Sequence, residues 1–244
     1  CLPANQERFA NGKLVTVQFH PSAQVVMTAG HDRSVSLFQV KNFSLNPKIQ
    51  SIYLESFPIY KARFSVDGEQ VIATGTHHSM FFVYDMMAGS IIPIPKVRGV
   101  EEKFLRNFEL SPDGSFMLLI GTSGYLHLLS MKTKELISTM KVNGRCTASA
   151  FTPDSSKIYS YSSKYSSSSN HNSISIAQVL RSHVSSSSGV VNLYTTDTCL
   201  KEIRPKPVKA IMNLVTSATC VTFNPTTEIL AVASRDADEA VKLV

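Results

Sequence analysis

The sequence contains no tryptophan, and it has only four cysteines in 244 residues. Cys1, Cys146, Cys199 and Cys220 are far apart, so the chain has no CxxC motif of a metal or redox site. This usage is typical of reduced, buried thiols in a cytosolic or nuclear protein. No stretch approaches the run of about 18 apolar residues that a membrane span requires, and we expect no membrane association.

The motifs of the common enzyme classes are missing as well. The sequence has no GxGxxG motif, no phosphate-binding loop ending in Gly-Lys-Ser/Thr, and no HExxH motif. The segment GTSGY at 121–125 is not a nucleophile elbow, because Gly124 directly follows Ser123. Glu101 and Glu102 stand beside basic residues, which predicts a solvated connection and not an acid/base pair. We therefore predict no catalytic residues, no metal site and no cofactor, and the chain is not expected to be an enzyme.

The composition is that of an ordinary globular domain. Hydrophobic residues make up 43% of the chain, which is enough for a core. Helical periodicity is weak throughout, and the apolar runs have the length of strands. The formal net charge of +6 permits an RNA or an acidic protein as partner without requiring either.

Five segments repeat one pattern, which consists of an apolar anchor, a polar turn, a wholly apolar run, a turn of small residues and a second apolar strand. The anchors are Phe19, Phe64, Leu110, Phe151 and Phe223. The first three intervals between successive anchors match the period of a propeller blade, about 40–45 residues. The last interval, from Phe151 to Phe223, is too long for one such unit and too short for two.

The first unit shows why this pattern predicts stacked sheets. Residues 15–19 alternate between apolar and polar side chains, as expected of a strand with one covered face. Residues 24–29 are apolar on both faces, so this strand needs a cover on each side. Four-stranded sheets that lie between two neighbours, as the blades of a propeller do, supply that cover. Asp-Gly pairs at 67–68 and 113–114 predict hairpin turns.

A second landmark falls at the end of the predicted third strand. Phe38, Tyr84 and Leu129 follow their respective anchors at nearly the same separation along the chain. Tyr84 and Asp85 occupy the place of the Trp-Asp dipeptide that gives WD repeats their name. Asp32 falls in the turn between the second and third strands, where we expect its carboxylate to accept hydrogen bonds within the turn and to have no catalytic role.

These patterns predict an all-β fold, a WD-repeat β-propeller, with residues 1–244 forming a single propeller fragment. About six units are recognisable, of which two beside the long interval are damaged and the last is cut short. An unclosed propeller exposes sheet edges and an apolar blade face. We therefore expect the chain to aggregate or to need a partner when it is made alone.

A serine-rich tract occupies residues 160–188, and nearly half of its positions are serine. After the anchor Phe151 an aromatic landmark is due near position 170, but the next one is Tyr194. We interpret the tract as replacing strands inside two units, since a linker would join complete ones. The tract is either a divergent, locally disordered segment or an altered piece of coding sequence. Polar chain of this kind buries too little apolar surface to order itself, so we predict that it is mobile.

Two basic stretches are candidate contacts. The first lies in a connection between blades, and the second is broken by two prolines and has Glu202 as its only compensating acid. Their basic residues are Lys96, Arg98, Lys103 and Arg106 in the first stretch and Lys201, Arg204, Lys206 and Lys209 in the second. One interpretation is solvated loop charge. The other is contact with RNA phosphates or with an acidic protein surface.

Three long stretches carry a more specific resemblance. The segment VQFHPSAQVVMTAGHDRSVSLFQV at 17–40, together with 103–145 and 205–234, resembles the U-three small nucleolar RNA-associated protein eighteen family. The resemblance covers residues 14 to about 159 and 189–244, and it fails across 160–188. It implies a ring of seven blades without catalytic residues.

The resemblance also implies a function. Such proteins are scaffolds of the small-subunit processome, which assembles on nascent pre-ribosomal RNA with the U-three small nucleolar ribonucleoprotein. The implied partners are that ribonucleoprotein, the pre-rRNA, and other WD-repeat and helical-repeat subunits, and the implied location is the nucleus and nucleolus. The alternatives are a WD-repeat adaptor in another complex, such as a substrate receptor of a ubiquitin ligase, and a propeller enzyme. The blade-end turns lack the convergent His, Asp or Glu pairs of an enzyme, whereas fold alone does not separate a scaffold from an adaptor.

Overall fold

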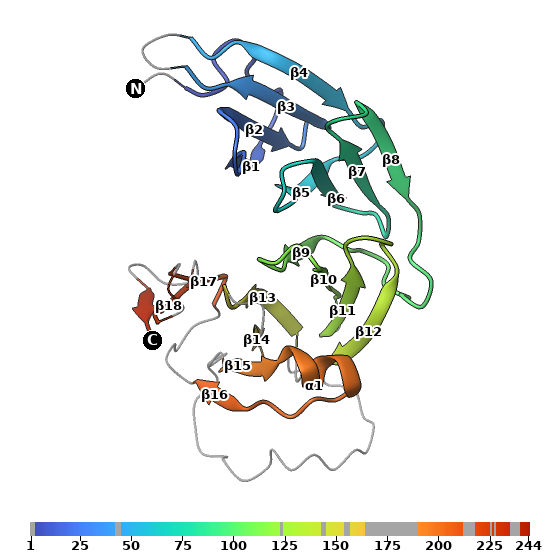
Figure 1. Cartoon of the computed structure of the whole chain (residues 1–244), viewed down its shortest axis with the longest axis vertical. Helices are drawn as coiled ribbons and strands as arrows, with labels where there is room; N and C mark the ends of the chain where they lie inside the picture. Colours follow the sequence, from blue (N-terminus) through green and yellow to red (C-terminus); the bar gives the residue numbers. More distant parts are fainter. Residues whose placement is uncertain are drawn as a thin grey trace.

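The structure is a computed structural model with five antiparallel sheets in the part of the chain that it describes. The described residues are 3–41, 45–122, 124–142, 145–153, 157–163, 190–211, 218–224, 226, 228–234 and 240–244. The sheets follow one another along the sequence and form an arc around a central axis (Figure 1). The predicted all-β propeller is confirmed.

Each sheet is a meander in which every strand pairs with the next strand of the chain. The first sheet consists of β1 (Leu14–Phe19), β2 (Val25–Gly30), β3 (Ser34–Gln39) and β4 (Lys48–Tyr53). The second consists of β5 (Ile59–Phe64), β6 (Gln70–Gly75), β7 (Phe81–Asp85) and β8 (Ser90–Ile94). The third consists of β9 (Asn107–Leu110), β10 (Phe116–Ile120), β11 (Tyr125–Ser130) and β12 (Leu136–Lys141).

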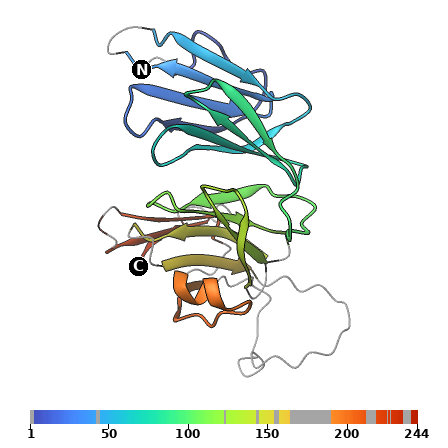
Figure 2. The same cartoon turned by 45° about the vertical axis from the view of Figure 1, so that its right-hand side comes forward.

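The fourth and fifth sheets complete the arc. The fourth consists of β13 (Arg145–Phe151), β14 (Lys157–Ser163), β15 (Val190–Thr195) and β16 (Lys209–Ile211), with the short helix α1 (Thr196–Lys201) between the last two strands. The fifth consists of β17 (Cys220–Phe223), β18 (Leu230–Ala233) and β19 (Val241–Leu243). Figure 2 shows this order from a second direction, with α1 beside the fourth sheet.

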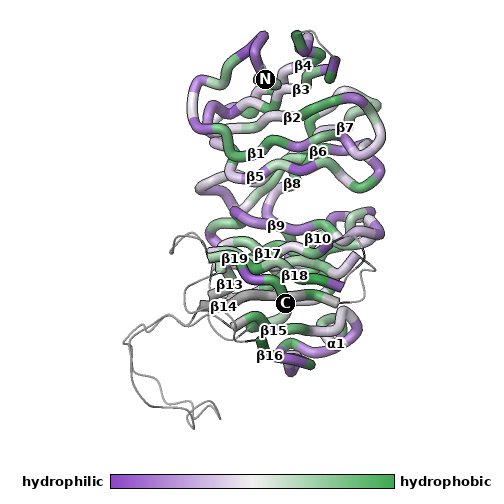
Figure 3. Tube along the Cα trace, turned by 90° about the vertical axis from the view of Figure 1, so that its left-hand side faces the viewer, coloured by the Kyte–Doolittle hydropathy of each residue, from purple (hydrophilic) through white to green (hydrophobic). Residues whose placement is uncertain are grey.

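The core lies between neighbouring sheets, in four separate clusters of buried side chains. Representative pairs, from the first interface to the fourth, are Met27 with Phe64, Phe81 with Phe108, Leu128 with Phe151, and Val191 with Val232. A strand inside such a stack is covered on both faces, which is why β2 is apolar on both faces as predicted: Val26 and Met27 are both buried. Hydrophilic residues gather in the turns at the ends of the strands (Figure 3).

The sequence landmarks fall where the repeat pattern placed them. Each of the five anchors ends the first strand of a sheet, and Phe38, Tyr84 and Leu129 lie in third strands. The carboxylate of Asp32 accepts hydrogen bonds from the Ser34 backbone N–H and hydroxyl, at 3.3 and 2.8 Å, so the predicted turn contact is present. Asp85 holds the next turn of its blade in a similar way, by accepting from two backbone N–H groups.

The structure differs from the sequence prediction in the number of units. Phe151 and Tyr194, which the repeat pattern assigns to two damaged units, belong to one sheet, because β14 pairs with β15 from Ser162↔Val190 to Lys157↔Thr195. The described residues therefore form five sheets and not six. The first residues of the serine tract, 160–163, belong to strand β14. The predicted mobility of residues 164–188 concerns a segment outside the described residues.

The expected apolar blade face is present in part on the first sheet. Val17 and Phe19 on β1 are 58% and 66% exposed. Farther out on this sheet Phe38 is fully buried. Residues 4–10 lie against its outer strands, where the Arg8 guanidinium donates a hydrogen bond to the Ser51 hydroxyl at 2.9 Å. The N-terminal segment thus covers part of a face that the repeat pattern alone leaves open.

Candidate functional site

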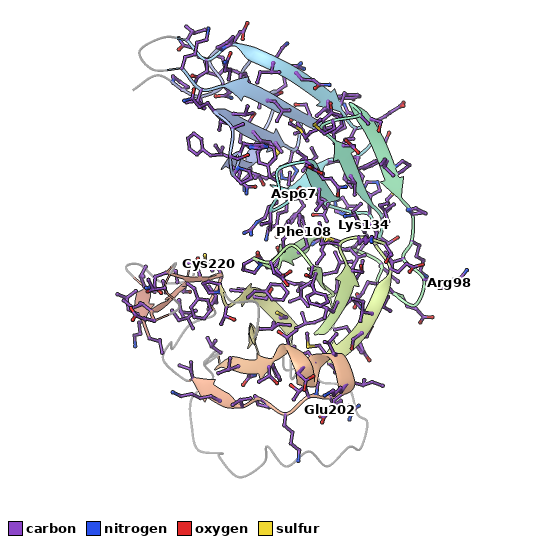
Figure 4. The ribbon with its side chains drawn as sticks, in the orientation of Figure 1. Asp67, Arg98, Phe108, Lys134, Glu202 and Cys220 are labelled. Atoms are coloured by element: carbon purple, nitrogen blue, oxygen red, sulfur yellow. The ribbon has the colours of Figure 1, made fainter. Side chains whose placement is uncertain are left out.

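The first predicted basic stretch does not form one patch. It runs from the outer strand β8 of the second sheet to the inner strand β9 of the third, and buried Val97 and Leu105 anchor it. Lys96, Arg98 and Lys103 are exposed, and Arg98 points outward at the rim (Figure 4). Arg106, the last of the four predicted residues, lies at the opposite end of this connection and lines the central cavity.

The second predicted stretch is held on the outside of the molecule by α1. Thr195 caps the helix, and buried Cys199 packs it onto β12, where its carbonyl accepts a hydrogen bond from the Ser138 hydroxyl at 2.7 Å. The Lys141 N–H then bonds to the Ile203 carbonyl at 2.8 Å, so the chain runs back along the third sheet. Glu202 marks this segment at the outer edge in Figure 4.

The basic side chains of this segment remain in solvent. The four predicted residues Lys201, Arg204, Lys206 and Lys209 are all exposed. Lys201 forms an ion pair with Asp197 at 2.9 Å, one helical turn away, so an acid that precedes the stretch also compensates part of its charge. Both partners of this pair are more than 70% exposed, and pairs of that kind contribute little to stability.

A central cavity of about 940 Å³ lies along the axis, and sequence reasoning did not predict its lining. The innermost strands and the turns beside them form its wall. Its basic and aromatic lining residues are Lys13, His31, Tyr60, Lys61, Arg63, Phe104 and Arg106. Among the described residues that line it there is no aspartate or glutamate. The sequence feature that could have indicated this basic wall is the pair of cations inside the first strand of the second unit, YKARF.

Two cations on β5 share a carboxylate on β9. The Lys61 ammonium lies 2.7 Å from one oxygen of Glu109, and the Arg63 guanidinium lies 2.9 Å from the other. Lys61 also donates to the Asn107 side-chain oxygen at 2.8 Å. Burial lowers the pKa of Lys61, while Glu109 acts in the opposite direction. The wall between the second and third sheets therefore carries a partly neutralised cluster with an excess of positive charge.

Arg106 is fixed in place in the wall of this cavity. Its Nε donates to the Thr76 carbonyl at 2.7 Å, and its guanidinium lies 5.3 Å from the centre of the Phe104 ring. The Phe104 ring in turn contacts the His77 ring edge-on, with centroids 5.9 Å apart. Because these contacts restrict the side chain, the guanidinium is pre-oriented for an anionic group.

Glu102 has a structural environment that the sequence did not reveal. We expected a solvated carboxylate, but it accepts hydrogen bonds from the Thr122 N–H and hydroxyl, at 3.1 and 2.7 Å. One of its oxygens lies 3.9 Å from Nε2 of buried His127. Burial lowers the pKa of His127, and Glu102 opposes that effect. The other ring nitrogen of His127 contacts the Thr139 hydroxyl at 3.0 Å, so this cluster joins the turn to the third sheet.

Cys146 and Cys199 are buried, as the sequence predicted, whereas Cys220 is exposed, so the prediction of a buried thiol is wrong at that position. Burial raises the pKa of the Cys199 thiol to about 12, which disfavours the thiolate that a nucleophile requires. No three His, Cys, Asp or Glu side chains gather as metal ligands among these residues. The helix α1 has six residues, and no described helix has the length and hydropathy of a membrane span.

Stacked four-stranded meanders with a Tyr-Asp landmark and turn-capping aspartates define a degenerate WD-repeat β-propeller. No protein-family profile matches the sequence. The chain is 53% identical, over its whole length, to the U3 small nucleolar RNA-associated protein 18 homolog of Homo sapiens, and 52% identical to that of Mus musculus. It is 34% identical to the Arabidopsis thaliana homolog over 99% of its length.

These identities show that the chain belongs to the U3 small nucleolar RNA-associated protein 18 family, as the resemblance in the sequence had indicated. The matched part covers 47–48% of the human, mouse and plant proteins, so the chain spans about half the length of these relatives.

Proposed function

We propose that this protein is a non-catalytic scaffold of the small-subunit processome that supports pre-rRNA processing and small ribosomal subunit biogenesis. The proposal rests on sequence identity. More than half of the residues, along the entire chain, are identical in relatives that are named for association with the U3 small nucleolar RNA. A stack of sheets with long exposed rims is suited to holding several partners at once. The proposed location is the nucleolus.

The proposed partners are the U3 ribonucleoprotein with its pre-rRNA, and the other WD-repeat and helical-repeat subunits of the processome. The non-catalytic part of the proposal is supported by the state of the polar side chains. The carboxylates of Asp32 and Asp85 accept hydrogen bonds within their own turns, and Glu102 does so from Thr122. These hydrogen bonds give the three carboxylates a structural role in the turns.

Affinity purification of the tagged full chain after expression in human cells tests the scaffold proposal. We expect processome proteins and U3 RNA to be recovered together. The WD-repeat adaptor is the rival, and recovery of ubiquitin-ligase subunits without processome proteins would establish it in place of the scaffold. Microscopy of the same cells gives the location, since the tagged chain should concentrate in nucleoli.

The exposed basic segment around α1 is the proposed outer contact with RNA phosphates or an acidic protein surface. Lys206 and Lys209 are both exposed. Reversal of both charges, Lys206→Glu with Lys209→Glu, should reduce recovery of partners, and the difference from the wild type should shrink as salt screens the charges. The matched control reverses two exposed lysines on other turns, Lys41→Glu with Lys132→Glu. Equal recovery with both pairs of variants would remove this segment from the proposal.

A further inference from the structure

The central cavity carries more positive charge than its internal ion pairs neutralise. Lys61 is occupied, because its ammonium contacts both Glu109 and Asn107. Arg63 shares the same carboxylate but its side chain is 40% exposed. Lys13 is exposed at the same cavity, and within the described residues its ammonium forms no ion pair. Lys61 and Arg63 thus share one glutamate, Glu109, and their combined charge exceeds that of their partner.

Flat groups stand among these cations. The Tyr60 side chain lines the cavity and is 43% exposed. The guanidinium of Arg106 lies over the Phe104 ring and is held there by its bond to Thr76. Aromatic rings and guanidinium planes beside a basic wall are the combination on which unpaired bases stack while cations follow the phosphates.

We propose that the inner wall of the central cavity binds single-stranded RNA, with Lys13, Arg63 and Arg106 at the phosphates and Tyr60 against a base. The inference rests on the proposed function, which brings the protein to RNA, and it places the RNA contact at a surface separate from the outer segment around α1. The volume of about 940 Å³ is at the upper end of the range of ordinary ligand pockets, about 300–1,000 Å³.

An acidic peptide is the other polyanion that such a wall attracts. RNA is favoured because a peptide carboxylate needs the cations alone, whereas the exposed Tyr60 ring adds stacking, worth about 1–3 kcal/mol per base. The restrained Arg106 plane provides a second stacking surface. The two ligands therefore predict different results when Tyr60 is changed.

Fluorescence anisotropy with a labelled oligouridine of about 12 nucleotides, within the usual site sizes, tests the proposal on the full chain. The double variant Lys13→Gln with Arg106→Gln should bind about tenfold more weakly near physiological salt, and the slope of log affinity against log salt should fall by about 1.4, because each phosphate contact to a single strand contributes about 0.7. Tyr60→Leu should weaken RNA binding about fivefold or more and leave the salt slope unchanged.

Two control variants separate this site from general charge. Lys41→Gln with Lys132→Gln removes the same charge outside the cavity and should change affinity less than twofold. Lys13→Arg keeps the charge in place and should retain RNA binding, because the exposed Lys13 side chain is proposed to act through its charge alone. Urea unfolding of each variant should show a cooperative transition, which separates loss of contact from loss of fold.

The outcomes that overturn the proposal are distinct from failure of the scaffold function. Equal weakening by the cavity variant and the outer control means that RNA binds by net charge alone. Preference for polyglutamate of equal charge, with no effect of Tyr60→Leu, means that the cavity takes an acidic peptide. Either result removes the RNA site while co-purification with U3 RNA stands. Loss of that co-purification together with intact RNA binding removes the scaffold function instead.

Discussion

Truncation of Phe108 to alanine should weaken the interface between the second and third sheets more than any surface change. The Phe108 side chain on β9 is fully buried and packs with Phe81 and Leu105. The Lys61 ammonium also lies 5.5 Å from its ring centre. Removing a buried phenyl ring loses its transfer free energy and leaves a cavity, and such changes cost about 3–5 kcal/mol.

The size of the effect can be checked by unfolding. In a chain of this length, about 1 kcal/mol shifts the midpoint of thermal unfolding by about 2–4 °C, so Phe108→Ala should lower it by about 10 °C. Urea unfolding followed by circular dichroism gives the same quantity independently. The matched control is Phe19→Ala, because Phe19 ends the equivalent first strand but is 66% exposed. That control should stay within about 0.5 kcal/mol of the wild type.

A loss below about 1 kcal/mol for Phe108→Ala, or a loss equal to that of Phe19→Ala, would refute the reasoning. In either case the two sheets would not be held together by the side chains that the structure places between them. The stacking of sheets, on which every later inference depends, would then need another explanation.

Two further predictions concern the buried His127 on β11 and the turn at Gly68. Burial lowers the pKa of His127 below 6.5. Its contribution to the free energy of unfolding should therefore be fully present above about pH 6.5 and should be lost as pH falls through the lowered value. His127→Asn should flatten the pH dependence of the urea midpoint between these two pH values. Identical pH profiles for the two proteins would contradict this. Gly68 has a φ of +81°, and a β-carbon there would contact the His20 ring. Gly68→Ala should therefore lose more than about 1 kcal/mol of the free energy of unfolding, as measured by urea unfolding. Gly89→Ala, with φ +64° and only an ordinary contact, should lose less, and equal losses would rule out the contact with His20.

The fold was largely predictable because its repeat depends on local chemistry. Each anchor and each turn follows from period-two burial and from Asp-Gly or proline turns, which the sequence displays directly. The interval from Phe151 to Phe223 did not determine the number of blades in this part of the chain. Its length is consistent either with two shortened units or with one unit that contains a long connection. Only the pairing of β14 with β15 distinguishes these two cases, and pairing between distant strands leaves no local signature.

The candidate site was less predictable, because neighbours in sequence separate in a propeller. Arg106 was grouped with Arg98, yet the connection that holds both runs from the outer rim to the axis. Lys61 and Arg63 were overlooked because two cations in a strand resemble a solvent-facing pattern. Their position on an innermost strand is what places them in the cavity.

The most direct test of the central claim is the amount of U3 RNA that purifies with the tagged full chain from nuclear extract, measured against an unrelated abundant small nuclear RNA. The scaffold account predicts strong enrichment of U3 RNA together with processome proteins, in particles that sediment far ahead of the free chain. Recovery of the free chain alone, with U3 RNA at the background level, would contradict it.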